Sequence, residues 1–245
     1  MERTRFGLSV TTGLILLLAG ASFAVATPHP PDVNPANFVR GAVIDNQFFP
    51  LPVGRLFVYE GTKEGVATRD ELCVTHRTNK VIEGVQITEV HHRSFELSAG
   101  KYVLVEDTFD WHAQDVYSNV WYFGEATTEF PSLSTEGSWE AGVDDADAGL
   151  IMEAAPRVGD RYYQEFAPKV AEDQAKVISL KGSACVRYKG GTCYEDLLVT
   201  QETSRLDPGV VEIKYYAAGV GFIRSDVVKG GDEHTELVSI DSCSE

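Results

Sequence analysis

Carboxylates are the side chains of this sequence best suited to acid–base chemistry. Candidates in its second half are Glu136, Glu140, Asp144, Glu172 and Asp173. A hydrolase built on two carboxylates holds one protonated and one ionised across a cleft. The sequence has 37 Asp and Glu residues against 21 Lys and Arg. Because carboxylates are so common, their positions do not single out one catalytic pair. A carboxylate-dependent hydrolase is therefore an alternative hypothesis without designated catalytic residues, and no GxSxG elbow indicates a serine nucleophile.

Acidic residues also cluster in a glycine-flanked segment. Asp144, Asp145 and Asp147 offer the oxygen ligands that calcium prefers, although the segment lacks the EF-hand pattern. The sequence thus keeps two interpretations open, a calcium-binding secreted protein and a solvated acidic loop. No other cofactor is expected.

The six histidines give a weaker signal for a metal site. His91 and His92 are adjacent, so they point to opposite faces of a strand. His76, His92 and His112 would have to meet across neighbouring strands, and nothing in their spacing requires it.

Aromatic residues are the third possible site. Trp111, Trp121, Tyr122, Phe123 and Trp139 are close in sequence, and aromatic faces can line a pocket for an apolar or sugar ligand. The alternative is that they form the hydrophobic core. The working hypothesis is an exported binding or structural protein without catalytic activity, which holds a small molecule or glycan near Trp111, Trp121, Tyr122, Trp139 and Tyr215.

The elements that position these side chains are predicted to be strands. Phe109, Trp111 and Ala113 alternate with Asp110, His112 and Gln114, a period of two that gives a strand one buried and one wet face. Short β-branched or aromatic runs at 101–105, 120–123, 197–200 and 210–216 are bounded by turn residues. At most one short helix is expected, at 168–178. The predicted fold is all-β and mostly antiparallel, a sandwich or open barrel.

Two parts of the chain resemble each other. Residues 71–85 align with 196–210, and 53–57 echo 158–162. This predicts one β domain, 48–245, with two related halves at about 48–130 and 155–240. An acidic, glycine-rich loop, 131–154, joins them, and a Pro-rich extended leader, 27–47, precedes them.

The N-terminus indicates export. Arg3 and Arg5 precede a short apolar run, and Ala24 and Ala26 form a small-residue cleavage pattern, so residues 1–26 are read as a signal peptide. The run is too short for a membrane span, and the protein is expected to be secreted or periplasmic.

The four cysteines fit an oxidising compartment. They predict two disulfides with three possible pairings. A turn signal between Cys185 and Cys193 favours a hairpin staple, which leaves Cys73 to pair with Cys243.

The formal charge of −16 and the absence of a basic run exclude nucleic acid as a partner. No motif in the sequence specifies the oligomeric state or the identity of a ligand.

Several motifs cover most of the chain after the leader. They are FPLPVG (49–54), YEG (59–61), DTFDW (107–111), AQD (113–115), NVWYFGE (119–125), EGSWEAGVD (136–144) and AED (171–173). In these motifs the chain resembles a family of exported bacterial β-rich proteins with no established activity. The resemblance implies export and a β-rich fold, and it brings no catalytic or binding residues. Where relatives tend to have an Asp-x-Asp-Gly-Asn turn, this chain has DVYSN at 115–119.

Overall fold

The computed structural model describes residues 29–77 and 79–244. The predicted signal peptide, 1–26, lies outside the described residues. Within them, strands dominate, and the helical elements are two short 3-10 turns, η1 (Pro35–Asn37) and η2 (Tyr188–Gly190). The expected mostly antiparallel all-β fold is confirmed. No helix among these residues is long and apolar enough to cross a membrane.

The strands are named in chain order. They are β1 (Arg55–Lys63), β2 (Val66–Val74), β3 (Val81–Ile82), β4 (Val85–Gln86), β5 (Thr88–Ser98), β6 (Lys101–Gln114), β7 (Val120–Glu129), β8 (Trp139–Glu140), β9 (Gly149–Met152), β10 (Arg161–Tyr163), β11 (Asp173–Val186), β12 (Thr192–Ser204), β13 (Val211–Ala217), β14 (Gly221–Lys229) and β15 (His234–Ser242).

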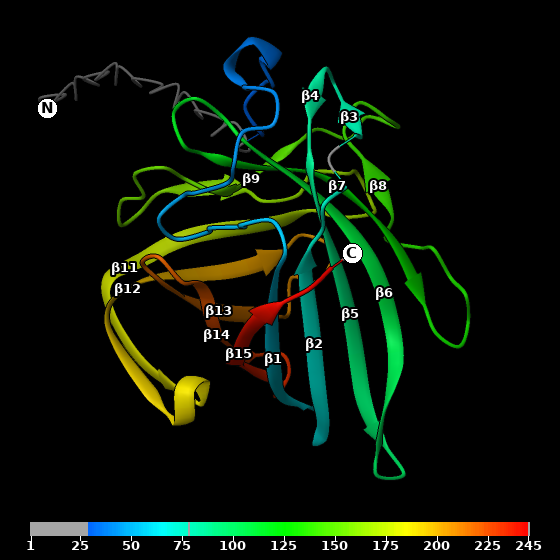
Figure 1. Ribbon diagram of the computed structural model, residues 1–245, viewed down its shortest axis with the longest axis vertical. Coiled ribbons are helices and arrows are strands. Elements are labelled where there is room, and N and C mark those ends of the chain that lie inside the picture. The colour runs from blue at the N-terminus through cyan, green and yellow to red at the C-terminus, as the bar shows by residue number, and fades with distance from the viewer. Residues whose placement is uncertain (1–28, 78, 245) are drawn as a thin grey trace, which may run out of the picture.

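One sheet contains 13 of the strands found in the described residues, and it is strongly bent. Its order is β10-β11-β12-β13-β14-β15-β1-β2-β5-β6-β7-β8, with β9 also paired to β7 and with β3 and β4 forming a separate hairpin. Figure 1 shows the sheet curving around an interior, with β11 and β12 on one side and β5 and β6 on the other. This single bent sheet corresponds to the open form that the sequence predicts.

The two ends of the sheet approach each other beside β9. The backbone N–H of Asp147 donates to the carbonyl of Phe166 at 2.8 Å. At Gly149 an added Cβ would lie 2.0 Å from the carbonyl oxygen of Gln164. A glycine there allows the backbones to come close enough to narrow the gap in the sheet.

The predicted helix at 168–178 is wrong. Residues from Asp173 onward form β11, in which Ala175 and Val177 are buried while Gln174 and Lys176 are more exposed. This alternation has a period of two, and β10 and β12 pair with the strand on either side. Tertiary pairing together with β-branched Val177 and Ile178 outweighs a weak helical pattern.

Segments outside the main strands also contribute to the hydrophobic core. In the leader, Phe38 packs edge-on against Trp121 and Phe123, with ring centroids 6.0 and 5.8 Å away. Ile44 is buried and pairs with Leu51. The predicted connector 131–154 contains two short strands, β8 and β9, and both pair with β7.

Both favoured disulfides are present. Cys73 is bonded to Cys243, which ties the C-terminal segment to β2. Cys185 is bonded to Cys193 and staples the β11–β12 hairpin. Disulfides persist in oxidising compartments, so they favour a location outside the cytoplasm.

The repeat of two halves stays a prediction. Residues 71–74 lie in β2 and residues 197–200 lie in β12. Gly159 and Leu197 are farther apart than Gly54 and Leu72 because β11 lies between them.

Candidate functional site

Two adjoining cavities lie on the inner face of the bent sheet. We call them the aromatic cavity, of about 350 Å³, and the acidic cavity, of about 340 Å³. The residues that line both are Tyr59, Leu72, His92, Glu106, Lys214 and Phe222. Because these shared residues come from strands on both sides of the bend, the curvature of the sheet creates the space.

Aromatic rings form much of the wall of the aromatic cavity. They are Phe49, Phe57, Tyr59, Tyr122, Tyr216 and Phe222. Tyr59 and Phe222 pack with centroids 5.1 Å apart, and the Tyr59 hydroxyl donates to the Phe222 carbonyl at 3.1 Å. These contacts fix the rings in place and leave an apolar surface facing the cavity.

A bulge in β7 brings two polar side chains of that strand to the same cavity. Asp110 of β6 pairs with Glu125 of β7, and His112 pairs with Tyr122. Two residues along β6 therefore correspond to three residues along β7. The extra residue places Tyr122 and Glu125 on one face, where regular alternation would separate them. Gly124 within the bulge has a φ of 121°, a conformation that favours glycine.

Tyr122 joins two carboxyl groups in this cavity. Its hydroxyl lies 2.6 Å from Asp110 Oδ1 and 2.9 Å from Glu125 Oε2. A hydroxyl has one proton to donate, so it satisfies only one ionised carboxylate. The second contact becomes a hydrogen bond when one of the two carboxyls is protonated and donates to the phenol oxygen. The geometry therefore favours a protonated carboxyl at Asp110 or Glu125.

Burial explains why that proton is retained. It raises the pKa of Glu125 to about 7, with the charge of Asp110 adding to the effect. It also raises the pKa of Asp110, against the opposing charge of His92. The Tyr122 hydroxyl stays protonated because burial and both carboxyls raise its pKa.

The two basic residues lining the aromatic cavity have carboxylate partners of their own. Lys214 Nζ lies 2.8 Å from Glu202 and 3.3 Å from Glu212. His92 Nε2 lies 3.3 Å from Asp70. Burial opposes the charged His92, but Asp70, Asp110 and Glu106 outweigh it and raise its pKa to about 9. Both groups are thus cationic at neutral pH and already paired.

His112 is a neutral polar group in the same wall. Its side chain lines the aromatic cavity and is only 6% exposed. It stacks on Tyr122 at 4.7 Å, and burial lowers its pKa to about 3. Its Nδ1 has no hydrogen-bond partner among the described residues, which leaves a buried polar atom unsatisfied beside an open space.

Of the five predicted ligand-binding residues, only Tyr122 lines the aromatic cavity. Trp111, Trp121 and Trp139 are each 7% exposed and belong to the hydrophobic core. Trp111 lies under Lys80, whose Nζ is 3.5 Å from the ring centroid. Tyr215 packs with Arg224. The structure does not bring these five residues together around one cavity. A binding surface formed by them stays a prediction.

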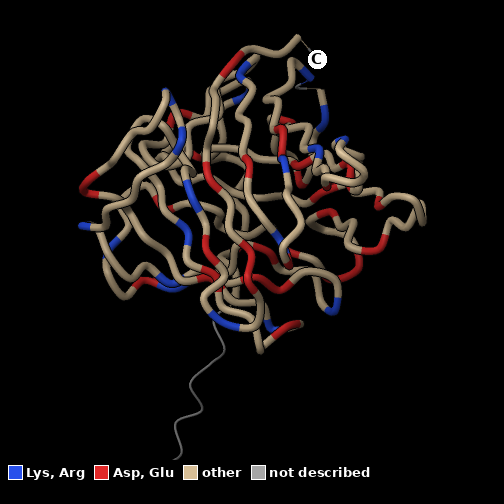
Figure 2. Tube along the Cα trace, turned by 90° about the horizontal axis from the view of Figure 1, so that it is seen from below, with Lys and Arg blue, Asp and Glu red and all other residues tan. Residues whose placement is uncertain are grey.

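The predicted carboxylates are dispersed. Glu136 and Asp144 are exposed, Glu140 pairs with Lys80 at 2.7 Å, and Glu172 pairs with Arg205 at 3.4 Å. Asp173 at the start of β11 has a pKa raised by burial. Figure 2 shows that acidic residues, in red, are spread over much of the backbone trace.

The residues that the sequence reasoning missed are mainly the inward-facing carboxyls. Asp110, Glu125 and Glu165 line the aromatic cavity. One signal was available, because Asp110 and His112 occupy the polar face of an otherwise aromatic strand. The alternation predicts that this face is exposed to solvent, whereas in the structure it lines a cavity inside the bend.

The acidic loop gives no further support for calcium. Asp144 and Asp145 are exposed, and Asp147 lies 3.3 Å from His29. Among the residues described, no group of three or more His, Cys, Asp or Glu side chains is arranged to hold a metal ion. His76, His92 and His112 do not form one either.

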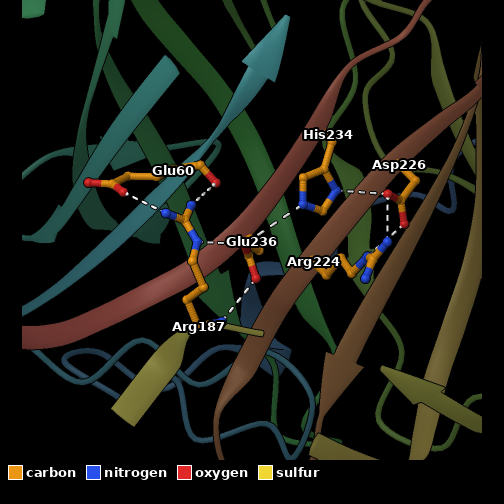
Figure 3. A network of polar contacts seen from close by, with 6 residues as sticks. All are labelled: Glu60, Arg187, Arg224, Asp226, His234 and Glu236. Atoms are coloured by element: carbon orange, nitrogen blue, oxygen red, sulfur yellow. Dashed lines mark hydrogen bonds and ion pairs between the residues drawn. The ribbon is translucent and has the colours of Figure 1, made fainter. Parts of the chain in front are cut away.

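A separate polar network lies on the outer face of the sheet (Figure 3). Arg187, at the tip of the stapled β11–β12 hairpin, contacts Glu236 of β15 at 2.6 Å and Glu60 of β1 at 3.1 Å. His234 and Arg224 both bind Asp226 at 2.8 Å. Since these groups are mutually paired and partly exposed, the network docks the hairpin onto the sheet and does not form a binding site.

No family model and no curated protein matches the chain. Among solved structures, an exported protein of Bacteroides fragilis described as having a YMCC-like fold is 14% identical, covering 80% of this chain and 100% of that one, with a TM-score of 0.40. A lipoprotein of Parabacteroides distasonis is 12% identical, covering 80% and 99%, with a TM-score of 0.35. Similarity at this level supports no conclusion about function.

Proposed function

We propose that this protein is an exported, non-catalytic binding protein whose small-molecule ligand occupies the aromatic cavity. The observation that carries the proposal is a space of about 350 Å³ lined by both aromatic rings and polar groups. Small-molecule sites commonly have volumes of about 300 to 1,000 Å³, mostly apolar walls and a few convergent polar groups. This cavity has that composition.

The polar groups support binding because they are not fully satisfied by the protein. His112 has a buried Nδ1 without a partner among the described residues, and the Tyr122 hydroxyl, which contacts both Asp110 and Glu125, has only one proton to donate. A ligand with polar groups would supply the missing interactions, while its apolar part packs against Phe57 and Phe222. The site proposed from sequence thus moves from the tryptophans to the inner face, with Tyr122 common to both.

The test uses N-phenyl-1-naphthylamine, a neutral dye that fluoresces in apolar surroundings. We expect saturable binding at one site per chain. Leu72→Trp should weaken binding at least tenfold, because Leu72 lines both cavities and a larger side chain fills the space. Leu97→Trp is the matched control, since Leu97 is 42% exposed at the end of β5. Equal binding by both variants, or no saturable binding by the unmodified protein, contradicts the proposal.

A second candidate function is a carboxylate-dependent hydrolase. One observation favours it: Asp110 and Glu125 contact the same hydroxyl, and burial raises both pKa values, an arrangement in which one carboxyl can be protonated while the other is ionised. Both contact the same hydroxyl, however, and so occupy one wall of the cavity. Release of nitrophenol from a panel of nitrophenyl glycosides, lost in Asp110→Asn, would support hydrolysis over binding alone.

A further inference from the structure

We infer that the ligand of the aromatic cavity is a cation, an ammonium group carried on an apolar body. This inference rests on the proposed binding function and adds the chemical class of the ligand. It stands on the charges of the cavity wall, on the aromatic rings that face them and on the buried unpartnered His112.

The lining of the cavity holds more acidic than basic side chains, and burial raises the pKa of Asp110, Glu125 and Glu165, so a cationic partner would favour their ionised forms. Its lining carboxyls are Glu106, Asp110, Glu125 and Glu165, against the two basic residues His92 and Lys214. Those two are held by Asp70 and by Glu202 with Glu212. His92 favours the ionised form of Asp110 and Lys214 favours that of Glu165, but the two basic residues are outnumbered by the four lining carboxyls.

The Tyr122 hydroxyl lies 2.6 Å from Asp110 and 2.9 Å from Glu125, and a proton on one of these carboxyls satisfies both contacts when no ligand is bound. An ammonium group in the cavity would replace that proton as the positive partner, and each carboxyl could then accept a charge-assisted hydrogen bond. Such bonds are among the stronger polar interactions in a partly buried site.

The aromatic walls favour the same ligand. Tyr59, Phe222 and Tyr216 form a continuous set, with centroids 5.1 and 5.8 Å apart, on the wall that also contains β1, β13 and β14. Ring faces attract cations through their quadrupole and also bury apolar atoms. His112, neutral and with Nδ1 unpartnered, adds no positive charge that would repel a cation.

The experiment compares three probes with one phenylbutyl body and different head groups: 4-phenylbutylammonium, 4-phenylbutanol and 4-phenylbutanoate. Each is titrated to displace N-phenyl-1-naphthylamine from the full chain with its disulfides intact. We expect the ammonium to bind at least tenfold more tightly than the alcohol, and the carboxylate to bind most weakly.

Variants assign the preference to the cavity. Glu125→Gln and Asp110→Asn should each reduce the ammonium-to-alcohol ratio to about threefold or less while retaining dye binding. Glu129→Gln is the matched control, because Glu129 is an exposed carboxyl on the same strand, β7. It should leave the ratio unchanged, although it alters the net charge equally.

The outcomes separate this inference from the proposed function. If the dye binds and the alcohol equals the ammonium, the cationic class is wrong while the binding site stands. If Glu129→Gln lowers the ratio as much as Glu125→Gln, the preference comes from overall charge and the inference fails. If the dye does not bind at all, the proposed function fails and the inference with it.

Discussion

The raised pKa of Glu125 in the aromatic cavity makes folding stability depend on pH in a defined direction. Glu125 has a pKa raised from 4.5 to about 7, chiefly by burial. Between these values the unfolded chain releases its proton while the folded protein keeps it. The folded state therefore binds more protons, and stability falls as pH rises through this window.

The size of the effect follows from the shift. A change from 4.5 to about 7, at 1.36 kcal/mol for each unit, corresponds to roughly 3 kcal/mol of destabilisation above pH 7. Water in the cavity screens the charge, so this figure is an upper bound. Glutamine has the shape of the protonated acid and never ionises. Glu125→Gln should thus stabilise the protein by up to about 3 kcal/mol at pH 8 and by about 1 kcal/mol or less at pH 5.

Denaturant unfolding followed by fluorescence, with the disulfides intact, measures both free energies. Glu129→Gln, exposed on the same strand, should show no such dependence on pH. An equal effect of Glu125→Gln at pH 5 and pH 8 would refute the reasoning, because it would mean that Glu125 is ionised in the folded protein at both values. A loss of stability at pH 8 would refute it as well, since the ionised carboxylate would then be the favourable state.

Four further results are expected. His92→Gln should cost up to about 3 kcal/mol at pH 7, because the raised pKa of His92 contributes stability below pH 6.5 that is lost as pH rises through about 9; a pH series of unfolding curves checks it. Replacing both cysteines of the Cys73–Cys243 pair, separated by 170 positions, should cost about 5 kcal/mol, against about 2.5 kcal/mol for Cys185–Cys193, separated by 8; similar melting temperatures for the two double variants would contradict this. Gly124→Ala should lower stability by roughly 2 kcal/mol or more and abolish dye binding, because its Cβ would lie 2.2 Å from the Trp139 carbonyl oxygen. Millimolar calcium should leave the melting temperature unchanged, since Asp144 and Asp145 are exposed and separate from a third ligand group; a rise of several degrees would restore the calcium hypothesis.

Much of the β architecture could be predicted from local patterns. Alternation along 109–114 and the turn residues at 83–84 and 207–209 predict strands and hairpins because side-chain direction and turn geometry depend on neighbouring residues only. The preferred cysteine pairing is of the same kind for Cys185 and Cys193, which face each other across a hairpin. Where two weak patterns compete, as at 168–178, local preference fails because pairing with β10 and β12 decides the conformation.

The site depended on features that no local pattern encodes. Regular alternation places Tyr122 and Glu125 on opposite faces, and only the bulge at their pairing with Asp110 and His112 brings both to the cavity. Likewise, the polar face of β6 is compatible with an outer surface and with the wall of a cavity, because polar side chains are tolerated in both places. The bend of the sheet decides between them.

By itself, the sequence determined that this chain forms antiparallel strands and has paired cysteines, and it predicted a signal for export, because each property follows from residues close together or from composition. Tertiary structure alone decided which aromatics became core and which carboxyls became buried neighbours. Asp110, Glu165 and Lys214 are far apart in the chain. They line one cavity because the bend of the sheet brings the strands of its two sides to face each other. The electrostatics of the site arise from that bend. Burial and short distances between the charged groups shift the pKa values, and both exist only once the sheet has bent.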